Sequence, residues 1–216
     1  RNAVVFDFVG GMREYNRRAE SGDAVSFFGL DLYSLQTSTA AVIDYLESVD
    51  LPAAARARRR YGCFEEFGGD QEYGRAVAFG ISDSCRRGVV EQLVELRRAA
   101  DSYLRRDGIA AEDEQFYAEQ NARIVVGAEE YYRAMFGAPT QTWNLRDHHM
   151  AETLERLEQH LGRHGAMPKI VVWEHNSHVG DARETEMVRR AEGNLGQLAR
   201  ERQPQGTFLI GFTTFT

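Results

Sequence analysis

PKIVVWEHNSHVGDAR, residues 168–183, decides the fold that the sequence predicts. After Pro168 the chain runs through the apolar residues 170–173, three of which are β-branched. A continuous apolar run of this kind is typical of a strand that is covered on both faces, as in a parallel sheet. The run ends in a polar cluster at residues 174–178. The sequence therefore predicts a buried strand with chemically useful side chains at its carboxyl end.

Further strands and helices extend outward from this stretch. Short apolar runs predict two more strands, at residues 24–28 and 207–213. Apolar residues recur at helical spacing in several longer segments, and Pro52 is placed to open a short helix. The expected helices cover residues 3–19, 35–49, 85–105, 112–136, 145–162 and 187–202, and an irregular connection is expected at 61–84.

The order of these elements predicts an α/β fold. A strand is followed by a long helical insert, a second strand, a helix and a third strand, which favours a mostly parallel sheet with a large helical insertion. We expect the strand and helix core at residues 1–50 and 168–216, and the insertion at about 51–165. Three strands are too few to close a core, so the 216 residues are expected to be a fragment of a larger domain.

Composition and charge narrow the expected partners. The net charge is −7, and a mildly acidic chain has no electrostatic attraction for nucleic acid or anionic membranes. No apolar run has the length of a membrane span and no signal peptide is recognisable, which favours the cytoplasm. Cys63 and Cys85 form no CxxC pair and are expected to be reduced, half-buried thiols. Nothing in the sequence indicates an oligomeric state.

The carboxyl ends of the three expected strands give the first group of candidate site residues. Ligands of open parallel sheets bind beyond these ends, and neighbouring parallel strands place them on one rim. The first strand is followed by residues 29–34, the second by 174–178 and the third by 213–214. The candidates on this rim are Asp31, Tyr33, Glu174, His175, Asn176 and His178.

His175 and His178 are the candidates with the clearest chemical use. Imidazole titrates near neutral pH, so it can take or give a proton during turnover. One alternative is that both histidines only cap the strand and bond to the backbone. Another is a metal site, because histidines three residues apart can chelate, although the chain shows no obvious third ligand.

A second candidate segment is WNLRDHHM, residues 143–150. Arg146 is expected to stabilise an oxyanion or to pair with Asp31 or Glu174. Asp147 could line the site or could only cap a helix that begins here. The adjacent His148 and His149 point in different directions on a helix, so they are expected at the surface or at an interface. The chain has no G-x-S-x-G, P-loop or G-x-G-x-x-G motif, which argues against a nucleophilic-serine hydrolase or a common nucleotide enzyme.

Together these stretches resemble the erythromycin esterase-like proteins. The resemblance runs along almost the whole chain, and its most specific part is WNLRD-x-HM followed by VVW-x-HN-x-HVGDAR. The segments that carry it are FFGLDLYSL at 27–35, RARRRYGCFE at 56–65, FYAEQNARIVVGAEEYYRAMF at 116–136, WNLRDHHMAETLERL at 143–157, IVVWEHNSHVGDAR at 170–183 and GNLGQLARER at 193–202.

The resemblance implies an α/β hydrolase whose characterised relatives cleave the macrolactone ester of macrolide antibiotics. It implies attack by water that a histidine and a glutamate activate, without an acyl-enzyme, a metal or another cofactor. That activating histidine and its acid belong to a family segment expected upstream of Arg1, so the chain would supply only part of the site and could be inactive alone.

The implied roles fall on residues already singled out. His175 and His178 would position or protonate the reacting groups, and Arg146 would stabilise negative charge. The expected substrate is a small-molecule ester or lactone. Asp31 and Tyr33 would bind it or orient the histidines, and Asp147, Glu174 and Asn176 are also expected to bind substrate or to orient the site. Two alternatives remain open, a metal-dependent enzyme that uses the two histidines and a non-catalytic relative that binds a small molecule or haem.

Overall fold

The helix α6, Ile109–Ala134, is the centre of the fold. Its small buried side chains recur at helical spacing, at Ala118, Ala122, Val125 and Ala128, and they let neighbouring helices approach closely. Four helices pack against α6, namely α2 (Leu35–Val49), α4 (Asp70–Ala78), α5 (Arg86–Leu104) and α7 (Pro139–Gly162).

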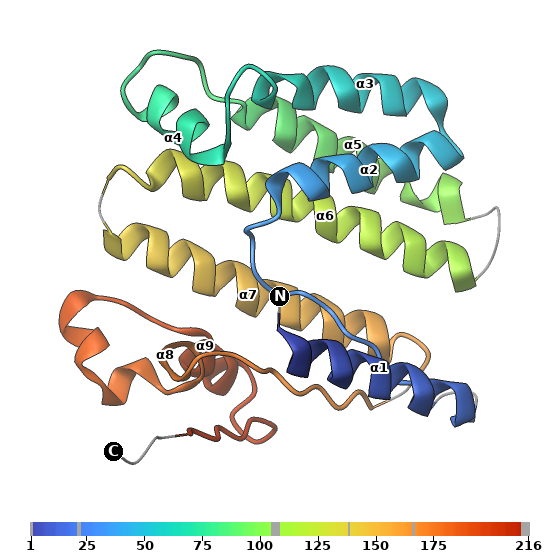
Figure 1. Ribbon diagram of the computed structural model, residues 1–216, viewed down its shortest axis with the longest axis vertical. Coiled ribbons are helices and arrows are strands. Elements are labelled where there is room, and N and C mark those ends of the chain that lie inside the picture. The colour runs from blue at the N-terminus through green and yellow to red at the C-terminus, as the bar shows by residue number, and fades with distance from the viewer. Residues whose placement is uncertain (1, 21–22, 105–108, 138, 166, 213–216) are drawn as a thin grey trace.

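The structure is a computed structural model that describes residues 2–20, 23–104, 109–137, 139–165 and 167–212. Its helices form two layers, with α2 to α6 above and α7 with the C-terminal segments below (Figure 1). The remaining elements are α1 (Ala3–Arg18), α3 (Leu51–Tyr61), η1 (Gly62–Phe64), α8 (Asn176–Val179), η2 (Ala182–Glu184), η3 (Glu186–Arg190) and α9 (Leu195–Arg202).

Each layer has its own apolar core. The upper one gathers side chains of α2, α3, α5 and α6, including Val42, Leu46 and Leu96. The lower one is smaller and joins α7 to α9 through Met150, Ala151 and Leu195. It lies next to the polar residues considered below, so packing of α7 against α9 also positions those residues.

The predicted α/β fold is wrong, because the described residues form helices and no strand. The segments expected as strands are extended, but they bond to no neighbouring strand. A strand exists only where an adjacent chain completes its hydrogen bonds, and apolar sequence does not supply that neighbour. Several apolar side chains there face solvent, with Val171 91% and Phe208 87% exposed, whereas Val172 packs against the lower core. Only residues 207–212 of the third expected strand belong to the described part.

The expected helices agree better with the structure. The helices at 35–49, 85–105 and 112–136 are confirmed within a few residues by α2, α5 and α6. The helix expected from 145 begins earlier, so Trp143 and Asn144 lie within α7 and do not cap it. The helix expected at 187–202 is shorter, because Ala191 adopts a left-handed conformation at φ 54° and Asn194 caps a new helix, α9.

Two other expectations need correction. The irregular connection at 61–84 contains η1 and α4, and α4 has acidic residues in its first turn that favour a helix start. Cys63 and Cys85 are joined by a disulfide that links η1 to the residue preceding α5, so they are not reduced thiols. The sequence spacing gave no sign of this pairing, because the path of the intervening segment, which contains α4, brings the two cysteines together.

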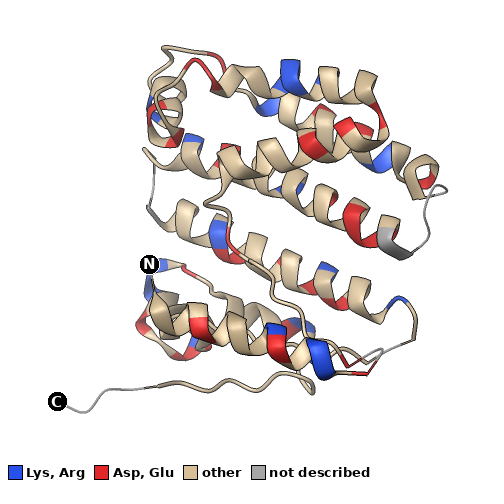
Figure 2. Ribbon diagram, turned by 45° about the vertical axis from the view of Figure 1, so that its right-hand side comes forward, with Lys and Arg blue, Asp and Glu red and all other residues tan. Residues whose placement is uncertain are grey.

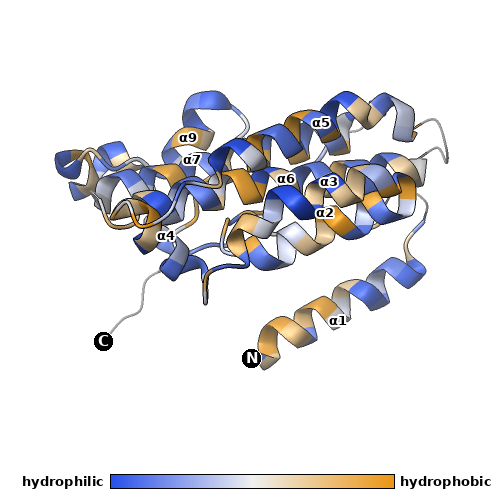
Figure 3. Ribbon diagram, turned by 90° about the horizontal axis from the view of Figure 1, so that it is seen from above, coloured by the Kyte–Doolittle hydropathy of each residue, from blue (hydrophilic) through white to orange (hydrophobic). Residues whose placement is uncertain are grey.

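Helix α1 stands apart from the bundle, as Figure 3 shows, and none of its residues is buried. Phe8 of α1 contacts Trp173 edge to face, with 6.1 Å between ring centres. Trp173 belongs to the second segment that was expected to be a strand. Acidic and basic residues are intermixed along the helices (Figure 2). No helix in the described ranges is long and apolar enough to cross a membrane.

Candidate functional site

The candidate site lies where the first half of α7 meets the segment before α2, the helix α8 and the start of α9. The structure brings Asp31, Tyr33 and Arg146 together in one group of contacts, and Asp147 with His178 in another. Arg146 and Asp147 are consecutive residues of α7, so both groups of contacts are built on this helix. The predicted meeting of these residues therefore occurs without the predicted sheet.

The Asp147–His178 pair is the most buried part of the site. Asp147 is fully buried and His178 is 5% exposed. Nδ1 of His178 lies 3.0 and 3.1 Å from the two carboxylate oxygens of Asp147, and Oδ1 also accepts the backbone N–H of Leu195 at 2.8 Å. A carboxylate only accepts hydrogen bonds, so Nδ1 of His178 is the donor and its proton is fixed there.

This pairing prepares His178 for proton transfer through its other nitrogen. The hydrogen bond to Asp147 raises the pKa of His178 against the opposing effect of burial, and the charge of Glu174 acts in the same direction. No hydrogen bond from the described residues occupies Nε2. An imidazole that one carboxylate orients and that keeps Nε2 free has the arrangement required of a general acid or base.

Arg146 is held by the predicted partner Asp31. Nε of Arg146 lies 3.0 Å from both oxygens of Asp31, and Nη2 lies 2.6 Å from Oδ2. This hydrogen bonding raises the pKa of Arg146 further above its ordinary value, so the group remains a cation. The guanidinium also lies 4.7 Å from the centre of the Tyr33 ring, within the range of a cation–π contact.

Tyr33 joins this group to the upper layer. Its Oη lies 2.9 Å from Oη of Tyr131 on α6, and the rings meet edge to face. Burial and this hydrogen bond raise the pKa of Tyr33, so it remains a neutral phenol at physiological pH. Asp31 and Tyr33 therefore orient Arg146, whereas the sequence reading allowed them to orient the histidines.

Glu174 lies in the same electrostatic environment. Burial raises the pKa of its carboxyl, the charge of His178 lowers it, and the charges of Asp147 and Asp31 raise it again. Its Oε2 is buried, and no donor in the described part of the chain reaches it. A half-buried carboxyl without a donor binds its proton more tightly than an exposed one.

His175 and Asn176 are exposed and differ from His178 in their surroundings. Nδ1 of His175 accepts the backbone N–H of Ser177 at 3.2 Å, which leaves the ring proton on Nε2 in the neutral form. His175 is thus arranged as a hydrogen-bond donor. The side chain of Asn176 binds both the N–H and the carbonyl of Phe212, so it fixes backbone and offers substrate little.

The start of α9 holds α8 in place by direct backbone contact. A Cβ at Gly196 would lie 2.3 Å from the carbonyl oxygen of Gly180 and 2.4 Å from that of Val179, so only glycine fits. Asn194 donates to the carbonyl of Ser177 at 2.9 Å and accepts from the backbone of Ala182 and Gln197. These contacts set the position of His178, which is part of α8.

Three residues near the site had no functional role in the sequence reading. Trp143 stacks on His178, Asn194 binds α8, and Tyr131 was expected to be core. The spacing of Trp143 four residues before Asp147 was the one available signal, because it places both on one face of a helix. His149 was expected at the surface or at an interface, and its imidazole packs against Gly127 of α6, with Nε2 buried and without a hydrogen-bond partner among the described residues.

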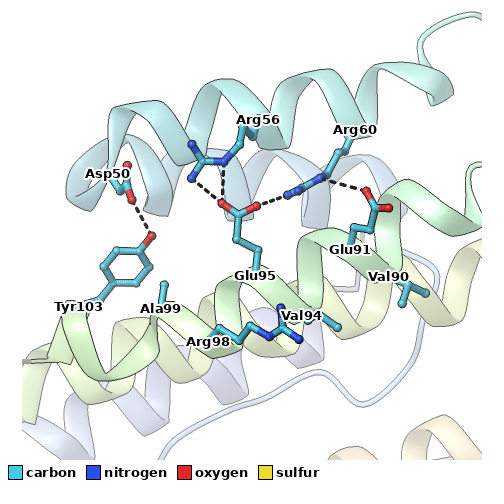
Figure 4. Close-up of a pocket in the computed structure, with 10 residues that line it drawn as sticks. All are labelled: Asp50, Arg56, Arg60, Val90, Glu91, Val94, Glu95, Arg98, Ala99 and Tyr103. Carbon is cyan, nitrogen blue, oxygen red and sulfur yellow. Dashed lines mark hydrogen bonds and ion pairs between the residues drawn. The ribbon is translucent and has the colours of Figure 1, made fainter.

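A metal site and a surface groove are two alternatives to this site. Among the described residues, no group of three or more His, Cys, Asp or Glu side chains is arranged to hold a metal ion. A groove of about 570 Å³ lies between α3 and α5 (Figure 4), where Arg56 and Arg60 both bind Glu95 and Tyr103 donates to Asp50. These pairs join the two helices, and none of the predicted site residues lines the groove.

The arrangement supports proton transfer beside a fixed positive charge. His178 can exchange a proton at Nε2, His175 can donate a hydrogen bond, and Arg146 can stabilise an anion. In the comparisons, the family model described as erythromycin esterase matches residues 1–216. No solved structure matches the chain.

Proposed function

Since the chain belongs to the erythromycin esterase family and is therefore expected to be a hydrolase, we propose that it takes part in the hydrolysis of a small-molecule ester or lactone. The observation that carries the proposal is the buried Asp147–His178 pair, in which Nδ1 is bound to the carboxylate and Nε2 has no hydrogen-bond partner among the described residues. An ester-cleaving site of this kind needs a group that exchanges protons near neutral pH and a stabiliser of the oxyanion.

In this reaction water adds to the ester carbonyl, and the alcohol leaves from the tetrahedral intermediate. Nε2 of His178 takes the proton of the attacking water, and the resulting imidazolium, which the raised pKa favours, gives a proton to the leaving alkoxide. His175 donates a hydrogen bond from Nε2, and Arg146 stabilises the negative charge that develops on oxygen. Asp31 and Tyr33 keep Arg146 in place, and the site needs no cofactor for these steps.

The test is a hydrolysis assay of the purified protein against macrolactones, smaller lactones and simple esters. We expect His178→Ala to lower kcat/KM at least about 100-fold, the usual scale for an acid–base group. Arg146→Lys keeps the charge but loses the paired geometry, so we expect a smaller loss. His178→Ala with wild-type rates on every hydrolysed substrate would remove His178 from the mechanism.

Chelation separates this proposal from a metal-dependent reaction. The assay is repeated after dialysis against EDTA, and again after Zn²⁺ or Mn²⁺ is added. Unchanged activity supports the hydrolysis proposed above. Activity that disappears with EDTA and returns with Zn²⁺ would assign the histidines to a metal. Ligand binding in a thermal-shift assay without turnover of any ester would instead indicate a non-catalytic binding protein.

A further inference from the structure

Trp143 and Asp147 contact the same imidazole from two directions. They lie four residues apart on α7, so they occupy one face of the helix. Asp147 binds Nδ1 of His178 in the plane of the ring, and Trp143 stacks on the ring face, with 4.6 Å between ring centres and 4° between planes. One helical turn therefore restrains both the hydrogen bond and the plane of His178.

The stack of Trp143 prevents a rotation of the His178 ring that the hydrogen bond to Asp147 alone would allow. A single hydrogen bond to Nδ1 allows the imidazole to rotate about the line that joins Nδ1 to Asp147. A stacked indole opposes this rotation, because turning the ring would break the contact across the whole face. With both contacts present, the direction of the unbonded Nε2 is fixed relative to α7.

Trp143 is itself fixed by the loop that precedes α9. Its Nε1 donates to the carbonyl of Gly193 at 2.7 Å. The neighbouring Asn144 accepts the N–H of Gly193 at 2.9 Å and donates to the carbonyl of Ala191 at 2.9 Å. The same loop reaches Asp147 through the N–H of Leu195. The indole is therefore held before a substrate arrives.

The stack also favours the charged form of the imidazole. An aromatic face attracts a cation, and Trp does so more strongly than other side chains. Asp147 and Glu174 act in the same direction on His178, whereas the positive charge of Arg146 opposes them. The opposing charge of Arg146 is reduced by its pairing with Asp31.

We propose that Trp143 is a positioning residue for His178, holding the imidazole so that Nε2 faces the reacting group and stabilising its protonated form. This inference rests on the proposed proton-transfer role of His178. An indole neither takes nor gives up a proton near neutral pH, so Trp143 does not itself react. Its effect reaches the reaction only through the orientation and protonation of the histidine.

The direct test is an NMR titration of ¹⁵N-labelled histidines, with the His178 signal assigned by its loss in His178→Gln. We expect Trp143→Leu to lower the pKa of His178 by about half a unit, since a cation–π contact is worth about 0.5–1 kcal/mol. Trp143→Phe keeps a weaker aromatic face and should give a smaller decrease. A His178 pKa that is unchanged in both variants would overturn the proposal.

Asn144→Ala is the matched control. It removes two hydrogen bonds to the loop but leaves the indole on His178, so it should lower stability without changing the pKa of His178. Equal pKa shifts in Asn144→Ala and Trp143→Phe would show that loop integrity, and not the aromatic face, controls the histidine. Trp143→Phe keeps the proposal testable if the leucine variant does not fold.

The kinetic readout separates this inference from the proposed function. Trp143→Leu should lower kcat about tenfold through misplacement of Nε2, with KM little changed, and should move the limb of the pH profile that belongs to His178 toward lower pH. If His178→Ala retains full activity, His178 has no part in the proposed hydrolysis, but the NMR result still decides whether Trp143 controls the imidazole. A lower pKa without a kinetic change would contradict the positioning role alone.

Discussion

The guanidinium of Arg146 lies against the carboxylate of Asp31, with 2.6 Å between Nη2 and Oδ2, although 115 residues separate them along the chain. The pair joins α7 to the segment before α2, and both side chains are partly shielded from solvent. Such pairs orient a cation more than they stabilise a fold, because each charge loses hydration on pairing.

We expect Asp31→Asn to cost about 2 kcal/mol of unfolding free energy, between the values for exposed and buried pairs. Arg146→Gln should cost a similar amount, and the double variant should cost less than the sum of the two. Urea unfolding of the four proteins measures the coupling. Strict additivity of the two single effects would show that the pair contributes no specific interaction.

The Asp147–His178 pair should contribute to the pH dependence of the unfolding free energy. The folded protein raises the pKa of His178, so this group stabilises the fold fully below its unfolded pKa of about 6.5. That contribution is lost as the pH rises through the raised folded pKa. Asp147→Asn should therefore flatten the decrease in stability that begins above about pH 6.5, and it should cost about 2 kcal/mol below that pH.

Urea unfolding between pH 5 and pH 9, covering the window on both sides of about 6.5, checks this sign. His178→Gln serves as the control, because it removes the titrating group and should flatten the same part of the profile. If the unfolding free energy still decreases by the same amount with rising pH in both variants, the decrease belongs to another titrating residue.

The sequence predicted the composition of the site better than its architecture. Asp31 was one of two partners expected for Arg146, and the structure pairs Arg146 with Asp31. Helical periodicity was decisive for α5 and α6, because the pattern within one segment already specifies which face is buried. A strand cannot be predicted in this way, because the run at 170–173 becomes a strand only if a neighbouring strand pairs with it, and the sequence pattern does not identify that neighbour.

The remaining site contacts depend on tertiary approach. Asp147 was predicted to line the site or to cap a helix, and only the packing of α9 against α7 shows that it binds both His178 and the N–H of Leu195. The stack of Trp143 on His178 has the same origin. Local propensity specifies helices, but it does not specify which residues face each other across two of them.

His149 should make the protein sensitive to acid. Burial lowers its pKa to about 4, from an ordinary value of about 6.5 in the unfolded chain. The unfolded state therefore binds the extra proton first, and stability should decrease as the pH falls from about 6.5 toward 4. At pH 5 the linkage amounts to about 2 kcal/mol.

Replacing His149 by Leu removes this proton and the unpartnered Nε2, so the acid-induced loss between pH 7 and pH 5 should become about 2 kcal/mol smaller. His148→Leu, at the exposed neighbouring position, is the matched control and should keep the wild-type loss. Urea unfolding at both pH values makes the comparison. Equal acid sensitivity in His149→Leu and the wild type would contradict the assignment.

The Cys63–Cys85 disulfide should contribute to the stability of the upper layer. It closes a loop with a sequence separation of 22 residues, for which loop entropy predicts about 3 kcal/mol. Thiol titration of the unreduced, denatured protein should detect no free cysteine. Reduction should then lower the urea midpoint, and Cys63→Ala/Cys85→Ala should reproduce the reduced value. A reducing agent that leaves the midpoint unchanged would show that the bond does not stabilise the fold.

The contact between Gly196 and the backbone of α8 provides the sharpest steric prediction. Gly196→Ala would place Cβ 2.3 Å from the carbonyl oxygen of Gly180, and backbone on both sides leaves no flexible side chain to yield. We expect α9 to be displaced at a cost of about 3 kcal/mol, with a change in the NMR signal of His178. Gly11→Ala is the matched control, because its Cβ meets nothing within 4 Å on α1, and alanine favours a helix by about 1 kcal/mol. A Gly196→Ala protein as stable as the wild type, with His178 unperturbed, would show that close approach of α9 does not determine the position of the histidine.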